Sequence, residues 1–101
     1  MNRKGKHVPV INITKFANRM GLPYEYVVVT EPLWDAMVRR ARPETTFHDV
    51  ITIMLSTLAR TIEQVGIEHC HIVGVEDQHG LFSVRVRFEK GRLHLDLIPP
   101  A

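Results

Sequence analysis

The side chains in this sequence that are best suited to chemistry are histidines and arginines spaced two residues apart in its last third. They are His69 and His71, Arg85 and Arg87, and His94. Residues two apart on a β-strand point to the same face of the sheet, so each pair would present its side chains together. Such a face can hold acidic or phosphate groups. The His69-x-His71 pair also has the spacing of two metal ligands on one strand.

A metal site on these strands is disfavoured by the distance between the histidines. His94 would be the third ligand, but we expect it two strands away from His69, which is about 10 Å at ~4.8 Å per strand. Arg87 would stand between them and bring a positive charge close to the cation. We therefore expect no metal and no cofactor. The simplest alternative to a binding surface is a set of solvated histidines.

Residues for covalent catalysis are not recognisable in the sequence. We expect Cys70 to lie in the middle of a strand and face the core, where a thiol behaves as a small apolar group. Its neighbours His69 and His71 would then point to the opposite face and could not activate it. The sequence also has no phosphate-binding glycine loop and no Gly-x-Ser-x-Gly motif. These features predict a protein that is not an enzyme.

The strands that position the histidines and arginines are predicted by the alternating pattern of residues 68–75, 81–89 and 92–98. Lys90-Gly91 is typical of a two-residue hairpin turn. The register that follows gives five cross-strand pairs: Phe88–Leu93, Val86–Leu95 and Val84–Leu97 on the core face, and Arg87–His94 and Arg85–Asp96 on the other face.

The register of the first hairpin is left open by the sequence. With Val75 opposite Leu81, which we prefer, Ile72 faces the core and both histidines of that strand face the arginines. A shift of one residue buries Val73 and Val75 instead. The loop 76–80 fits both registers, because hairpin loops of four and five residues are both common.

The first two thirds of the chain predict three helices and one further strand. The helices are expected over 13–20, 31–41 and 46–64, and the strand over 24–29. Thr30-Glu31-Pro32 is a typical helix start, with Thr30 as the expected cap, and Thr46 with Asp49 resembles a capping box. Together these elements predict an α+β fold, in which an antiparallel sheet of three to four strands packs on the helices.

The composition indicates a single domain over 10–101 that follows a basic, flexible tail over 1–9. The chain has 101 residues, a formal net charge of +2 and one cysteine. A lone cysteine excludes an intramolecular disulfide and fits a reducing compartment. The apolar runs are too short to cross a bilayer, and no secretory signal follows the basic start. We therefore expect a cytoplasmic protein that does not act on membranes.

Residues 26–60 resemble the ribbon-helix-helix DNA-binding proteins. The features in common are a short strand that ends in Val29-Thr30, a helix that opens with Glu31-Pro32-Leu33-Trp34, a tight connection, and a second helix capped by Thr46. In that family, paired strands from two chains enter the major groove and read base edges. The resemblance implies binding to DNA as a dimer, although the strand 24–29 carries no Arg, Lys or Asn.

A broader resemblance covers most of the chain. The chain is similar to a small family carried by phages and plasmids in three successive parts. These are the run from Gly21 through Tyr24–Thr30 to Leu33-Trp34, then Phe47–Met54, then paired strands that end in Leu95–Pro99. The resemblance implies an α+β domain in which the strand 24–29 joins the C-terminal strands. It implies no activity.

Two hypotheses for function follow. The first is a non-enzymatic binding or accessory protein of a phage or plasmid, which docks on a host or element-encoded macromolecule and could act as an inhibitor. The expected contact residues are Arg85, Arg87, His69, His71 and His94. A homodimer through the same face would be sensitive to pH, because histidines gain charge as the pH falls.

The second hypothesis is a nucleic-acid-binding regulator. It would act in the manner of the ribbon-helix-helix proteins or through the basic sheet face, with help from Arg3, Lys4 and Lys6 in the tail. The two hypotheses differ in the partner, which is a protein in one and a nucleic acid in the other. Binding driven by phosphate contacts weakens steeply with salt, so the response to salt distinguishes them.

Overall fold

The computed structural model describes residues 9–77 and 80–99 of the chain. The elements in order are β1 (Val10–Asn12), α1 (Thr14–Arg19), β2 (Tyr26–Thr30), α2 (Glu31–Arg40), α3 (Phe47–Val65), the short 3-10 helix η1 (Ile67–His69), β3 (Ile72–Asp77), β4 (Gly80–Glu89) and β5 (Arg92–Ile98). The predicted α+β class is confirmed, and each predicted α-helix is right to within one residue at both ends. Arg3, Lys4 and Lys6, and with them nearly all of the predicted tail, lie outside the described residues.

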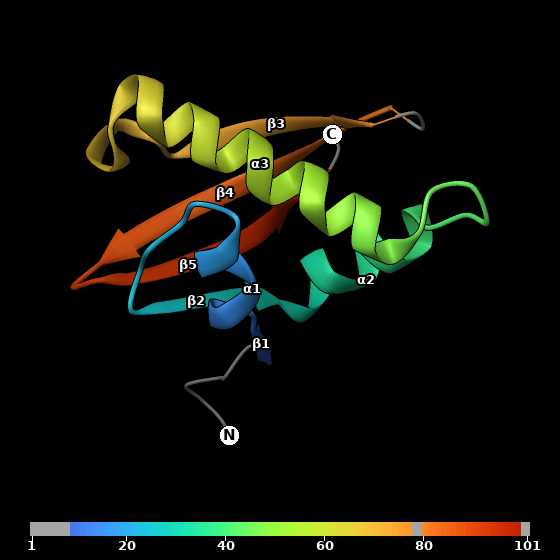
Figure 1. The fold of residues 1–101 in the computed structure, drawn as a ribbon, viewed down its shortest axis with the longest axis horizontal. Coiled ribbons are helices and arrows are strands. Elements are labelled where there is room, and N and C mark those ends of the chain that lie inside the picture. Colours follow the sequence, from blue (N-terminus) through green and yellow to red (C-terminus); the bar gives the residue numbers. More distant parts are fainter. Residues whose placement is uncertain (1–8, 78–79, 100–101) are drawn as a thin grey trace.

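The sheet has five strands in the order β1-β2-β5-β4-β3 (Figure 1). β2 runs parallel to β5, and the other neighbouring strands are antiparallel. The expected antiparallel sheet of three to four strands was therefore wrong in number and in type. The chain leaves β2 through two helices and a hairpin before it reaches β5, and this long crossover allows a parallel pair. β1 is only three residues long and has no pattern that would reveal it.

The hairpin of β4 and β5 has the predicted register. Phe88 lies opposite Leu93 and Arg87 opposite His94, and the other three predicted pairs also occur. The turn residues Lys90 and Gly91 have φ angles of 53° and 80°. Two positive φ angles in succession are the geometry of the type I′ turn, whose twist matches that of the strands.

The hairpin of β3 and β4 has the other of the two registers that the sequence allowed. Val73 lies opposite Val84 and Val75 opposite Phe82, so the preferred pairing of Val75 with Leu81 was wrong. Val73 and Val75 are buried, whereas the Ile72 side chain is 63% exposed. The strand also begins only at residue 72, because the preceding residues form η1 rather than extended chain. This register stabilises the hairpin by placing two pairs of apolar residues in the core.

Sequence signals set the ends of α3. Thr46 and Asp49 form the predicted capping box: the Thr46 hydroxyl accepts from the Asp49 backbone N–H at 3.2 Å, and the Asp49 carboxylate accepts from the Thr46 N–H at 3.0 Å. Gly66 ends the helix with a φ angle of 86°. At α2 the N-cap residue is Thr30, as expected, but the expected side-chain bond is absent. The Thr30 hydroxyl makes no cap bond and instead donates to the carboxylate of Asp96.

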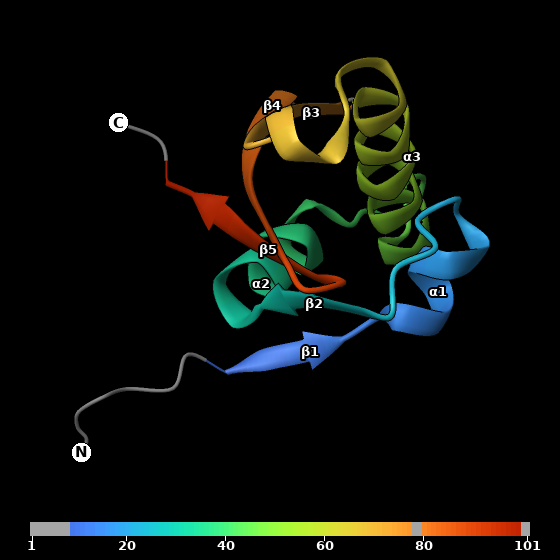
Figure 2. The same ribbon diagram turned by 90° about the vertical axis from the view of Figure 1, so that its left-hand side faces the viewer.

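The core lies on one face of the sheet, between the strands and all three α-helices. Figure 2 shows the sheet curving from β1 and β2 at the bottom to β4 and β3 at the top, with α1 and α3 on the right. The largest fully buried side chains of the core include Leu33, Met37, Met54, Leu55 and Leu58 of the helices and Leu93 and Leu95 of β5. The alternate residues of β4 and β5 point away from this core, and we call their surface the outer sheet face.

Candidate binding surfaces

The outer sheet face brings together three of the predicted site residues. Arg87 lies opposite His94, and Arg85 lies opposite Asp96 on the same face. Both arginine side chains are exposed, and His94 and Asp96 are half-buried. Arg92, at the start of β5, has the same orientation and lies opposite Glu89. The face thus carries three arginines within two neighbouring strands.

The carboxylate of Asp96 is held by hydrogen bonds and not by an arginine. Its Oδ1 accepts from the Thr30 hydroxyl at 2.7 Å and from the Leu97 backbone N–H at 2.8 Å. Within residues 9–77 and 80–99, no ion pair joins Arg85 to Asp96 or Arg87 to a carboxylate. The guanidinium groups of Arg85 and Arg87 are therefore free to bind an external anion.

An aromatic residue that the sequence did not single out lies on the same face. Tyr26 pairs with Arg92 across β2 and β5, and the Arg92 guanidinium is 5.9 Å from the centre of the Tyr26 ring. A cation at this distance from an aromatic face is weakly attracted to it. The pair could be foreseen only by predicting the parallel register of β2 on β5, for which the sequence has no local signal.

His69 and His71 are not where they were expected. His69 belongs to η1 and not to a strand, and His71 precedes β3, so the expected strand with two histidines on one face was wrong. The His71 carbonyl accepts from the Val86 N–H at 2.8 Å, which places Ile72 rather than His71 opposite Arg85. His71 still shares a surface hollow of about 850 Å³ with Arg87 and His94, whereas His69 does not line it.

The described residues contain no group of three or more His, Cys, Asp or Glu side chains that could hold a metal ion. Cys70 is 3% exposed, and burial raises the pKa of its thiol. A neutral thiol is a poor nucleophile and a poor metal ligand. Cys70 therefore belongs to the core, as expected, although it follows η1 instead of lying inside a strand.

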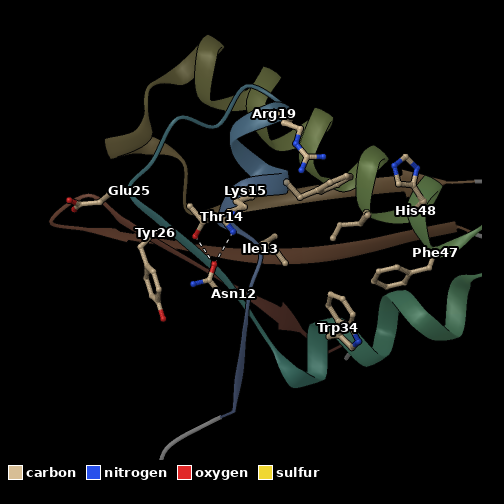
Figure 3. Close-up of a pocket in the computed structure, with 12 residues that line it drawn as sticks. Asn12, Ile13, Thr14, Lys15, Arg19, Glu25, Tyr26, Trp34, Phe47 and His48 are labelled. Atoms are coloured by element: carbon tan, nitrogen blue, oxygen red, sulfur yellow. Dashed lines mark hydrogen bonds between the residues drawn. The ribbon is translucent and has the colours of Figure 1, made fainter.

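The sequence also gave no indication of a groove on another side of the molecule (Figure 3). It has a volume of about 770 Å³ and lies where α1, the start of β2 and the first turns of α2 and α3 meet. We call it the aromatic groove; its lining residues are Asn12, Ile13, Thr14, Lys15, Phe16, Arg19, Glu25, Tyr26, Trp34, Phe47, His48 and Ile51.

Aromatic rings in close contact form much of the groove wall. The rings of Trp34 and Phe47 are 4.6 Å apart at 55°, and those of Phe16 and His48 are 5.4 Å apart at 75°. The helical spacing of these residues predicts core positions. In the structure each of the three large aromatic side chains is only half-buried, because one side contacts the core and the other lines the groove.

Comparisons with models of protein families, with curated proteins and with solved structures found no match to this chain. None of the helices within residues 9–77 and 80–99 is both long and apolar enough to cross a membrane.

Proposed function

We propose that this chain is a non-enzymatic binding or accessory protein that docks on an acidic macromolecule through its outer sheet face. The observation that carries the proposal is the exposure of Arg85 and Arg87 on the sheet face opposite the core, while Asp96, the cross-strand partner of Arg85, is bonded to Thr30. A guanidinium group binds carboxylate and phosphate through two parallel hydrogen bonds, so two such groups side by side favour an anionic partner.

The wider setting of this function comes from the sequence. The resemblance to a family carried by phages and plasmids supports a partner that belongs to a host or to the mobile element. The single, buried cysteine supports a role in the cytoplasm. A small domain that docks on a host complex through one charged face is well suited to act as its inhibitor.

The proposal is tested by capture of partners from host lysate with the parent chain and two variants. In the face variant, Arg85→Glu with Arg87→Glu, the charge of the face is reversed and the partner should be lost. The control, Arg39→Glu with Arg60→Glu, changes the total charge equally at exposed positions of α2 and α3 and should keep the partner. A face variant that retains every partner of the parent would show that the docking surface lies elsewhere.

A second candidate function, nucleic-acid binding, is favoured by Tyr26. An aromatic ring beside arginines on an open sheet face is how several families hold single-stranded nucleic acid, since bases stack on the ring and phosphates pair with the cations. The ribbon-helix-helix manner of binding would need β2 to pair with its copy in a second chain, but β1 and β5 occupy both of its edges. A nucleic acid would therefore use the outer sheet face.

A further inference from the structure

We propose that the aromatic groove is a second binding site, which takes a small carboxylic acid with an apolar body. Tyr26 lies both on the outer sheet face and at one end of the groove, but none of the three arginines of that face lines the groove. The inference therefore does not depend on the function proposed for that face. The inference rests on the apolar lining of the groove and on the positions of the charged residues around it.

The lining fits an apolar body. Ile13 and Ile51 are buried at the base, and the half-buried rings of Phe16, Trp34 and Phe47 surround the open space. Sites for small molecules are concave and mostly apolar, with a volume between about 300 and 1,000 Å³. The groove, at about 770 Å³, lies within this range. A ligand that covers the exposed sides of the three rings removes apolar surface from water on both partners.

The charges around the groove favour an anionic group at one end. Lys15 and Arg19 are four residues apart on α1 and therefore lie on one face of that helix. Both are exposed, and no ion pair engages either of them within the described ranges. Figure 3 places Arg19 and His48 along the upper rim, with Trp34 and Phe47 below them. Glu25, the one acidic residue of the lining, lies at the far end beside Tyr26.

This arrangement of charges favours one orientation of the bound ligand. A carboxylate pairs with Lys15 and Arg19 at the α1 end, and the apolar body extends across the aromatic rings. A carboxylate near Glu25 would be repelled, so the reverse orientation is disfavoured. A neutral alcohol of the same length loses the ion pairs, and acetate loses the apolar contacts.

The test uses decanoate below the concentration at which it forms micelles, and the fluorescence of Trp34, the only tryptophan of the chain. Decanoate should change this fluorescence saturably and shift the amide signals of α1 and of the first turns of α2 and α3. Decan-1-ol should bind about fivefold more weakly, as expected for the loss of one or two exposed ion pairs, and acetate should not bind.

Two double variants test the role of the charges. Lys15→Glu with Arg19→Glu should weaken decanoate binding about tenfold and should bind decylammonium in preference. Arg39→Glu with Arg60→Glu makes the same change of net charge outside the groove and should bind decanoate as the parent does. All four positions are at least partly exposed, so the fold is expected to survive.

The proposal is overturned if decanoate gives no saturable change of fluorescence, which is also the result expected of a groove that accepts only a polypeptide segment. It is equally overturned if decanoate and decan-1-ol bind alike and the reversal of charge has no effect, or if the shifted amides lie in β4 and β5. The Arg85→Glu, Arg87→Glu variant should still bind decanoate, so failure of the proposed docking face would leave this result unchanged.

Discussion

The Thr30 hydroxyl donates a hydrogen bond of 2.7 Å to the carboxylate of Asp96, and this bond joins the end of β2 to β5. The same carboxylate oxygen accepts from the Leu97 N–H, so Asp96 is held close to its own backbone. Arg85, its cross-strand neighbour on β4, stays exposed. The bond therefore contributes to the packing of the parallel strands and also to the positive charge that the outer sheet face presents.

Removal of the Thr30 hydroxyl should affect both stability and binding. Thr30→Val should lower the free energy of unfolding by about 1 kcal/mol, because one partly buried hydrogen bond is lost. It should also weaken binding to heparin, a soluble polyanion, because the released carboxylate can pair with Arg85. Urea unfolding and the salt needed for elution from heparin measure the two effects. Thr30→Ser keeps the hydroxyl and is the control. Parent-like elution of Thr30→Val would contradict this role of Asp96.

An ion pair between Arg40 and Asp77 holds α2 to the hairpin of β3 and β4. The Arg40 Nε lies 2.8 Å from the Asp77 carboxylate, whose side chain is 1% exposed, and the guanidinium also donates to the Gly80 carbonyl. Arg40→Ala removes the cation from a buried carboxylate and should cost about 3 kcal/mol, the lower end for such pairs because Arg40 is 19% exposed. Arg39→Ala, one residue earlier on the exposed side of α2, should cost less than about 0.5 kcal/mol in the same denaturant titration. An equal loss of unfolding free energy in the two variants would show that the Arg40–Asp77 pair contributes nothing to stability.

The Cys70 thiol should be unreactive in the folded protein. Burial raises its pKa, so the reactive thiolate is scarce near neutral pH, and the surrounding core also blocks the reagent. Labelling with a thiol reagent should be slow in buffer and complete in denaturant. Burial raises the pKa of the thiol in the folded protein only. The free energy of unfolding is therefore fully retained below the pKa of the unfolded thiol, and it falls as the pH rises through the pKa of the folded thiol. Rapid labelling without denaturant would contradict the buried position.

Nucleic-acid binding through the outer sheet face should depend on salt and on Tyr26. Single-stranded DNA held by a few arginines should lose about 0.7 log units of affinity per log unit of salt for each phosphate contacted. Tyr26→Leu should weaken this binding about tenfold or more, since one stacked base contributes about 1–3 kcal/mol. Fluorescence anisotropy of a labelled oligonucleotide at several salt concentrations measures both effects. Absence of binding at low salt would remove this alternative.

The parts of the fold that the sequence predicted well are those with local signals. Lys90 and Gly91 specify a tight turn, and the alternation on both sides of it then sets every pair of β4 and β5. Thr46, Asp49 and Gly66 mark the ends of α3 through their own backbone bonds and φ angles. The alternation along β4 and β5 also correctly placed Arg85, Arg87 and His94 on one face.

The parts that were missed depend on contacts between distant segments. The loop 76–80 allows two registers, and only the packing of Val73 and Val75 against the helices selects one. The parallel pairing of β2 with β5, and with it the position of Tyr26 on the outer sheet face, has no signal in either strand alone. The aromatic groove forms where three helices meet, so the helical spacing of Trp34 could not show that one side of its ring stays exposed.

Amide chemical shifts, followed as heparin is added, would show whether the outer sheet face is the docking surface. We expect saturable shifts in residues 83–87 and 92–96, which persist when Arg3, Lys4 and Lys6 are replaced by Gln. These shifts should be lost in Arg85→Glu with Arg87→Glu and retained in the control Arg39→Glu with Arg60→Glu. Shifts confined to other elements, or shifts that disappear with the tail charges alone, would contradict docking through this face.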